Sequence, residues 1–159
     1  MSVVQRKRSV LVVDDEDAVR EAICQTLVRE GYQVVDASNA NDALYEASRA
    51  RFDAAIVDIR MPGMPGDSLV PLLKKSCPDT IVIVLTAVSD DDPRFQALLH
   101  SNEAFACLKK PCTIKDLRAT LKMALEGLGD DADAALDRGT TSLLNRAGRF
   151  IHPTRPQAH

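Results

Sequence analysis

Five short apolar segments alternate with five amphipathic segments over the first 126 residues, and this alternation constrains the fold more than any other feature. The apolar segments cover residues 9–13, 33–37, 54–58, 81–86 and 104–108. Runs of Val, Ile, Leu and Ala without polar alternation are typical of strands that are buried on both faces. We therefore expect an α/β fold, in which a doubly wound, five-stranded parallel sheet carries helices on both faces.

Start and stop signals lie between these segments. Gly31 is in the position expected just after the end of the first helix. Pro71 is compatible with the third helix only near its first turn, because proline lacks the N–H that a helix interior uses. The expected helix starts are Asp17, Ser38 or Asn39, Asp67, the pair Asp91 and Asp92 ahead of Pro93, and Thr113 in a capping box with Asp116.

The composition changes after Leu125. Residues 127–159 hold four of the seven glycines, together with scattered polar residues and few apolar pairs. We therefore expect one folded domain over residues 8–126, followed by a C-terminal tail or short accessory segment at 127–159. That segment is too short to be a second domain.

Charge and hydropathy exclude several classes of protein. The net charge of −3 provides no basic footprint for nucleic acid, and the segment 127–159 has no basic helix-turn-helix pattern, so we expect no specific DNA binding. No apolar run reaches the roughly 20 residues that cross a bilayer, and the start lacks the separate apolar region of a signal peptide. Cys24, Cys77, Cys107 and Cys112 form no CxxC pair, which favours reduced thiols and a cytoplasmic location.

Reactive side chains gather at the carboxyl ends of the predicted strands, where open α/β sheets bind their ligands. Asp14 and Asp15 follow the first strand, Asp58 ends the third, Thr86 ends the fourth, and Lys109 and Lys110 follow the fifth. Each feature alone is ordinary, as a helix-terminus acid, a strand residue or a solvated lysine. Their occurrence together at one sheet edge is rare by chance and favours a built site.

The residue types at this edge suit a phosphate and a metal ion. Three converging carboxylates repel one another unless a cation lies among them, and hard oxygen ligands at a partly solvated site favour Mg²⁺. An aspartyl carboxylate can form an acyl phosphate, whose oxygens then need a metal, an ammonium and a hydroxyl donor. Asp58, Thr86 and a lysine would complete such a site.

Four motifs in order, VLVVDDE, IVDIRMPGMPG, LTA and LKKP, give the chain a clear resemblance to the receiver domain of two-component response regulators. The resemblance covers residues from about 8 to 126, and it implies the flavodoxin-like strand order 2-1-3-4-5. It also implies that Asp58 is the phospho-acceptor, Thr86 the switch hydroxyl and Lys110 the phosphate-binding lysine. Lys110 is chosen over Lys109 because it directly precedes Pro111, and the family usually holds that bond cis.

The same resemblance implies the metal ligands. Asp14 and Asp15 match the acidic pair, with Asp15 as the direct Mg²⁺ ligand. Asp58 and the backbone carbonyl of Arg60 match the remaining protein ligands. Pro62 and Gly66 match loop residues that shape the turn after the acceptor.

The resemblance further implies how the chain works. It would take a phosphoryl group from a histidine kinase or a histidine phosphotransfer protein and then switch its binding to a downstream protein partner. It would catalyse only its own phosphoryl transfer and slow dephosphorylation, so it is not an enzyme in the usual sense. The sequence leaves the oligomeric state open, with a homodimer as one option.

Some positions depart from the family pattern. Cys107 stands where the family commonly has an aromatic residue, and Arg60 and Val88 occupy positions that tune the loss of the phosphoryl group. We therefore expect the output to run through the fourth helix, fifth strand and fifth helix without rotation of an aromatic side chain. Movement of the loop at 87–92 would take its place.

Other readings of the sequence compete with this one. A dinucleotide-binding enzyme needs glycines after the first strand, and a P-loop NTPase needs GxxxxGK[ST], which is absent. An aspartyl phosphatase would have a second acid where Arg60 stands. Two alternatives stay open: a receiver-like interaction module that works without phosphorylation, and a receiver fragment of a larger regulator.

Overall fold

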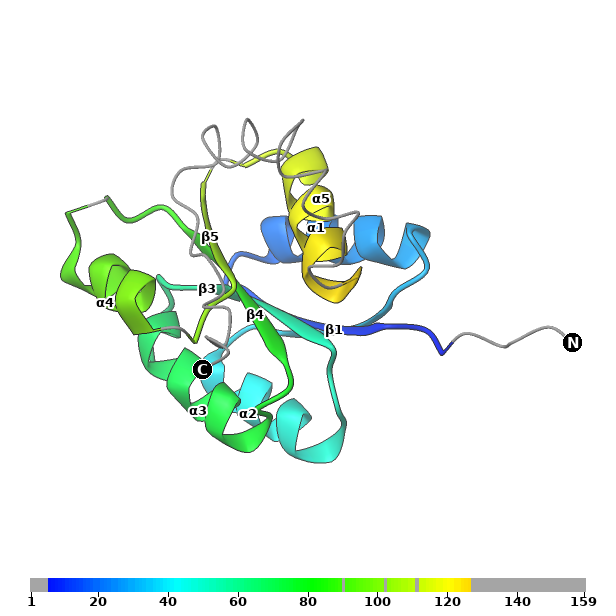
Figure 1. Ribbon diagram of the computed structural model, residues 1–159, viewed down its shortest axis with the longest axis horizontal. Helices are drawn as coiled ribbons and strands as arrows, with labels where there is room; N and C mark the ends of the chain where they lie inside the picture. Colours follow the sequence, from blue (N-terminus) through cyan, green and yellow to red (C-terminus); the bar gives the residue numbers. More distant parts are fainter. Residues whose placement is uncertain (1–5, 90, 102, 111, 127–159) are drawn as a thin grey trace, which may run out of the picture.

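The computed structural model describes residues 6–126, apart from residues 90, 102 and 111. These residues form one sheet of parallel strands in the order β2-β1-β3-β4-β5, which confirms the predicted topology (Figure 1). The strands are β1 (Ser9–Val13), β2 (Gln33–Ala37), β3 (Ala54–Asp58), β4 (Ile81–Thr86) and β5 (Ala106–Lys109). The segment 127–159 and the bond between Lys110 and Pro111 lie outside the described residues.

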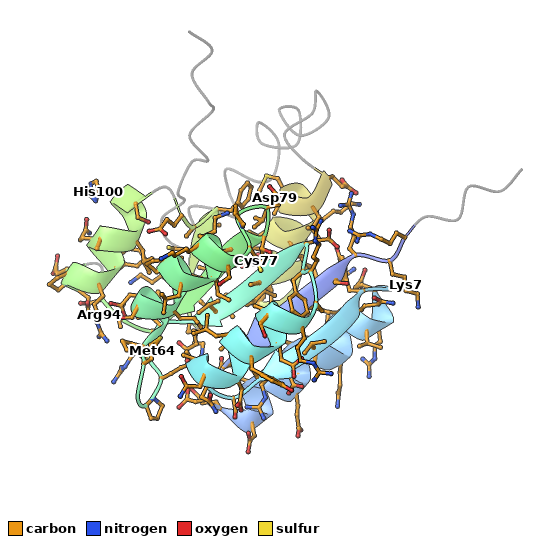
Figure 2. The ribbon with its side chains drawn as sticks, turned by 90° about the horizontal axis from the view of Figure 1, so that it is seen from below. Lys7, Met64, Cys77, Asp79, Arg94 and His100 are labelled. Atoms are coloured by element: carbon orange, nitrogen blue, oxygen red, sulfur yellow. The ribbon has the colours of Figure 1, made fainter. Side chains whose placement is uncertain are left out.

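Helices cover both faces of the sheet. They are α1 (Asp17–Arg29), α2 (Ala40–Arg49), α3 (Gly66–Ser76), α4 (Pro93–Ser101) and α5 (Ile114–Glu126). Helices α1 and α5 lie together on one face, and α2, α3 and α4 lie on the other (Figure 1). Figure 2 shows the second face from below, with Arg94 and His100 at the two ends of α4. The doubly wound arrangement follows because each parallel connection needs a crossover helix.

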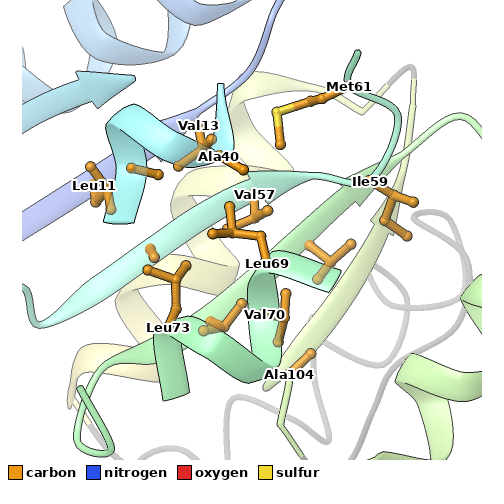
Figure 3. Packing of buried hydrophobic residues seen from close by; sticks show 14 of the residues in the cluster. Leu11, Val13, Ala40, Val57, Ile59, Met61, Leu69, Val70, Leu73 and Ala104 are labelled. Atoms are coloured by element: carbon orange, nitrogen blue, oxygen red, sulfur yellow. The ribbon is translucent and has the colours of Figure 1, made fainter. Parts of the chain in front are cut away.

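A hydrophobic core fills each side of the sheet. All five residues of β3 are buried, as its central position requires. Alternate residues face opposite sides, so Val57 packs with Leu69 and Leu73 under α3 (Figure 3), while Ile56 packs with Leu121 of α5 on the other side. Each fully buried side chain of this size contributes about 1.5–3 kcal/mol relative to exposure. The few aromatic residues are therefore no obstacle to a stable core.

Two of the expected helix starts are wrong. Asp17 lies inside the first turn of α1, and the N-cap residue is Glu16. The backbone N–H of Glu16 donates a hydrogen bond to Oδ1 of Asp14 at 2.9 Å. Asp67 likewise lies inside α3, whose N-cap is Pro65. In both places a residue earlier in the chain has the extended cap geometry, so the acid follows the cap instead of forming it.

The other helix signals act as expected. Asn39 accepts a hydrogen bond from the backbone N–H of Asp42 (2.8 Å), and Thr113 accepts one from that of Asp116 (3.0 Å). Gly31 has a φ of 96°, and Pro93 is the first residue of α4. Pro71, in contrast, lies in the second turn of α3, beyond the place expected for it.

Strand β5 starts two residues later than predicted. The predicted range began at Ala104, but the ladder with β4 pairs Ala106–Lys109 with Ile83–Thr86. Phe105 donates its N–H to Val82 (2.7 Å) before regular pairing begins. The strand ends at Lys109, and Lys110 follows it at the carboxyl edge of the sheet.

Candidate functional site

The carboxyl edge brings together the acids that the sequence singled out. Asp14 follows β1 and Asp58 ends β3, and these neighbouring strands place both carboxylates in the buried floor of the site. Asp15 is half-buried at its rim. Each of the three acids offers one carboxylate oxygen, and these three oxygens lie within 4.8 Å of one another. This is a donor set of hard oxygens that suits a small divalent cation such as Mg²⁺.

Lys110 spans the two buried acids. Its ammonium lies 2.9 Å from Oδ2 of Asp14 and 3.4 Å from Oδ2 of Asp58. The backbone N–H of Lys110 donates to the carbonyl oxygen of Thr86 at 2.7 Å, which fixes the lysine to the end of β4. Burial alone would lower the pKa of Lys110, but the hydrogen bond to Asp14 and the charge of Asp58 outweigh it, so that pKa is raised. The lysine is therefore a fixed positive charge in the site.

Asp58 is buried with little compensation for its charge. Burial raises its pKa to about 6, because desolvation of the carboxylate outweighs the attraction of Lys110 and the charge of Asp14 adds to the increase. Its Oδ1 accepts a long hydrogen bond of 3.2 Å from the backbone N–H of Arg60. A buried carboxylate with this little support favours a further positive charge nearby.

The loop after β3 is held by its backbone. Ile59 donates its N–H to the carbonyl of Leu85 (3.3 Å), and Gly66 donates to the carbonyl of Ile59 (2.8 Å). A Cβ atom at Gly66 would lie 2.1 Å from the backbone oxygen of Asp58, so a side chain there would displace the acceptor loop. Arg60 in this turn is exposed.

Thr86 ends β4 with its side chain fully buried. Its hydroxyl oxygen accepts a hydrogen bond from the backbone N–H of Val88 at 3.0 Å. The hydroxyl thus holds the start of the connection between β4 and α4. Movement of the Thr86 side chain would break this hydrogen bond and would therefore affect the connection between β4 and α4.

Sequence reasoning missed the role of Lys109. Its ammonium donates to the carbonyl oxygen of Val88 and lies 4.3 Å from the centre of the Phe95 ring. Residues two apart on a strand share a face, so the sequence alone could place Lys109 on the same side of β5 as Cys107. Cys107 is fully buried in the hydrophobic core, and this burial raises the pKa of its thiol to about 12.

An apolar groove of about 570 Å³ opens beside Lys110, between α1 and α5. Its walls include Val19 and Ile23 of α1, Leu85 at the end of β4, and Ile114 and Leu117 of α5. Ile114 is one of the exposed large hydrophobic side chains of the described chain. The groove gives the site an apolar border on this side.

The family model of the response regulator receiver domain matches residues 10–122. This chain belongs to that family. It is 35% identical over 120 residues to the DNA-binding transcriptional regulator NtrC of Proteus hauseri. The aligned residues cover 76% of this chain and 25% of that protein. The chain spans about a quarter to a third of the length of the first curated relatives it matches.

Solved structures agree with the family. A CheY-like receiver domain protein from Methanospirillum hungatei matches 82% of this chain and 99% of its own, with 28% identity and a TM-score of 0.71. The response regulator TrrA from Thermotoga maritima, solved in complex with Mg²⁺ and BeF, matches 74% of this chain and 99% of its own, with 32% identity and a TM-score of 0.65. The predicted receiver fold and response regulator family are therefore confirmed. Over the described residues, no helix is long and apolar enough to cross a membrane.

Proposed function

We propose that the chain accepts a phosphoryl group on Asp58 with the help of Mg²⁺. The observation that supports this most is the meeting of the carboxylates of Asp14, Asp15 and Asp58 with the ammonium of Lys110 at one sheet edge. We assign residues 8–126 to the receiver domain and the segment 127–159 to a tail or short accessory segment.

Each group has a part in phosphoryl transfer. A carboxylate oxygen of Asp58 attacks phosphorus, and the bond between phosphorus and the nitrogen of a phosphohistidine donor breaks. Lys110 neutralises the charge of one phosphoryl oxygen. The hydroxyl of Thr86 gives up the hydrogen bond that it accepts from the Val88 N–H, and it donates to a second phosphoryl oxygen. Asp14, Asp15, Asp58 and the carbonyl of Arg60 would hold Mg²⁺, which supplies charge neutralisation for the transferring group. The chain then catalyses only its own phosphorylation and slow dephosphorylation.

The donor is a histidine kinase or a histidine phosphotransfer protein. The groove between α1 and α5 borders Lys110, and its apolar walls suit the apolar face of a donor helix. Ile114→Glu would place a charge at the rim of this groove. We expect that variant to slow transfer from a phosphorylated phosphotransfer protein and to leave labelling by acetyl phosphate unchanged. The downstream protein partner then distinguishes the phosphorylated chain from the free one in the cytoplasm.

Mass spectrometry of the intact chain tests the proposed function. Incubation with acetyl phosphate and Mg²⁺ should add one phosphoryl group to the wild type and none to Asp58→Asn. EDTA should abolish the adduct because it removes the metal ion, and Asp15→Ala should abolish it because a metal ligand is lost. An adduct of the same extent in Asp58→Asn would refute the assignment of the acceptor, and a wild type that takes no phosphoryl group would favour a phosphorylation-independent interaction module.

A further inference from the structure

Arg20 joins three elements behind the acidic pair. Its Nη1 donates to the backbone oxygen of Asp14 at 2.8 Å, at the end of β1. Its Nε donates to Oδ2 of Asp36 in β2 at 2.8 Å, and its Nη2 to Oδ1 of Asp17 in α1 at 2.6 Å. The side chain of Arg20 is only 12% exposed, so the guanidinium is fixed at this junction.

These contacts fix the peptide unit that links Asp14 to Asp15. The carbonyl of Asp14 belongs to this unit and accepts from Arg20, while the N–H of Asp14, in the preceding peptide unit, donates to the carbonyl of Ala37 at 3.2 Å. A peptide unit is planar, so the orientation of that carbonyl also sets the direction in which Asp15 leaves the sheet. The position of the Asp15 carboxylate therefore depends on a hydrogen bond made on the far side of the peptide.

We infer that Arg20 is a positioning residue for the metal site, which it serves by holding the peptide between Asp14 and Asp15. The inference rests on the proposed function in one respect, namely that Mg²⁺ is the cation held there. Mg²⁺ demands near-ideal octahedral geometry at about 2.0–2.1 Å, so a displacement of Asp15 well below 1 Å weakens binding. Partners that orient metal ligands in this way change affinity by about 10–100-fold when removed.

A purely electrostatic role for Arg20 predicts the opposite change in Mg²⁺ affinity when Arg20 is removed. The guanidinium is a positive charge near the cation site, so its removal alone should tighten Mg²⁺ binding. The carboxylates of Asp17 and Asp36 pair with the guanidinium, but its removal subtracts one positive charge whether or not it is paired. Charge and positioning therefore predict opposite changes in Mg²⁺ affinity, and positioning predicts that removal of Arg20 weakens binding.

Calorimetric titration of Mg²⁺ into the unphosphorylated full chain tests the inference without reference to phosphorylation. Arg20→Gln should bind Mg²⁺ about tenfold more weakly than the wild type. Arg20→Lys should fall between the two, because its ammonium can still donate to the Asp14 carbonyl. Arg118→Gln is the matched control, since it removes a comparable ion pair of 2.7 Å between α5 and Glu30 away from the site, and it should bind as the wild type does.

The rate of phosphorylation by acetyl phosphate provides a second readout. Arg20→Gln should need about tenfold more Mg²⁺ for half-maximal rate, with a plateau within about twofold of the wild type. Unchanged or tighter Mg²⁺ binding in Arg20→Gln would overturn the inference. If Arg20→Gln does not fold by circular dichroism, Arg20→Lys decides, and wild-type affinity in that variant counts against positioning. A wild type that binds Mg²⁺ but accepts no phosphoryl group would refute the proposed function and leave the calorimetric test intact.

Discussion

Two aspartates lie at the opposite ends of β3, and their environments differ. Asp53 directly precedes the strand and is well supported: its Oδ1 lies 2.8 Å from Arg6 and 3.8 Å from Arg8, and its Oδ2 accepts from the backbone N–H of Ser9 at 2.8 Å. Asp58 ends the strand with its side chain 4% exposed, a 3.4 Å contact to Lys110 and a single long backbone hydrogen bond. One residue type therefore serves two purposes at the two ends of one strand.

The difference shows how the fold separates structure from chemistry. At the amino edge, Asp53 is a partly buried acid that is paired with Arg6 and ties the start of the described chain to the sheet. At the carboxyl edge, burial raises the pKa of Asp58 to about 6, so its charge is costly until a cation or a phosphoryl donor arrives. An acid that is buried with too few partners is a reactive acid.

Loss of the cation beside Asp58 should have the largest effect. Lys110→Met removes the ammonium that contacts both buried acids, and it should slow phosphorylation by acetyl phosphate at least about 100-fold, because one donor to a developing anion is worth that much. Lys109→Met is the neighbouring control and should keep the rate within about threefold, since Lys109 contacts Val88 and Phe95 instead. Rates come from quenched samples by mass spectrometry, and equal losses in the two variants would argue against the role of Lys110.

Neutralisation of the two aspartates should change stability in opposite directions. The folded-state pKa of Asp58 lies above its ordinary value, so protonation favours the folded state and stability is lost as the pH rises through about 6. Without Mg²⁺ at about pH 7.5, Asp58→Asn should therefore stabilise the chain by on the order of 2 kcal/mol, and this gain should vanish below about pH 4.

Asp53→Asn provides the contrasting case. It weakens the bonds from Arg6 and the Ser9 N–H, and it should destabilise the chain by about 1 kcal/mol. Urea unfolding at the two pH values measures both variants. A loss of stability in Asp58→Asn at neutral pH would show that its burial is fully compensated and would remove the contrast.

Binding of a phosphoryl mimic should loosen the connection between β4 and α4. If the Thr86 hydroxyl turns to the phosphate, the Val88 N–H loses its acceptor and should exchange several-fold faster. Hydrogen exchange of a peptide spanning residues 87–101, with and without beryllofluoride and Mg²⁺, measures this change. Lys109→Met should increase the exchange further, because Lys109 holds the Val88 carbonyl. Equal exchange in both states would favour a phosphate shuttle with little change of shape.

Arg60→Ala should have the smallest effect. The exposed side chain of Arg60 lies two residues beyond the acceptor, where it can shield the phosphoryl group or pair with its charge. Exposed ion pairs are worth about 0.2–1 kcal/mol, so dephosphorylation should speed up by at most about fivefold. The decay of purified phosphorylated chain measures it, and an unchanged half-life would mean that Arg60 only faces solvent.

The pattern of the sequence was enough for the sheet and for the residues at its carboxyl edge. Unbroken apolar runs predicted buried parallel strands, whose carboxyl ends share one edge and carry Asp14, Asp58 and the lysine pair. The resemblance to receiver domains added the strand order and the choice of Lys110, whose contacts with Asp14 and Asp58 agree with it. Long-range side-chain pairs were not predictable in this way. The contacts of Arg20 with Asp36 and of Lys109 with Phe95 depend on strand register and helix placement, which local patterns do not specify.

The tight approach of Gly66 to the acceptor loop has a genetic consequence. Every missense change in a glycine codon introduces a Cβ atom, and at this position that atom meets the backbone oxygen of Asp58. In a library of single-codon variants selected for phosphorylation, codon 66 should therefore survive only with synonymous third-base changes. A residue with no side chain would thus leave one of the sharpest signatures in the gene.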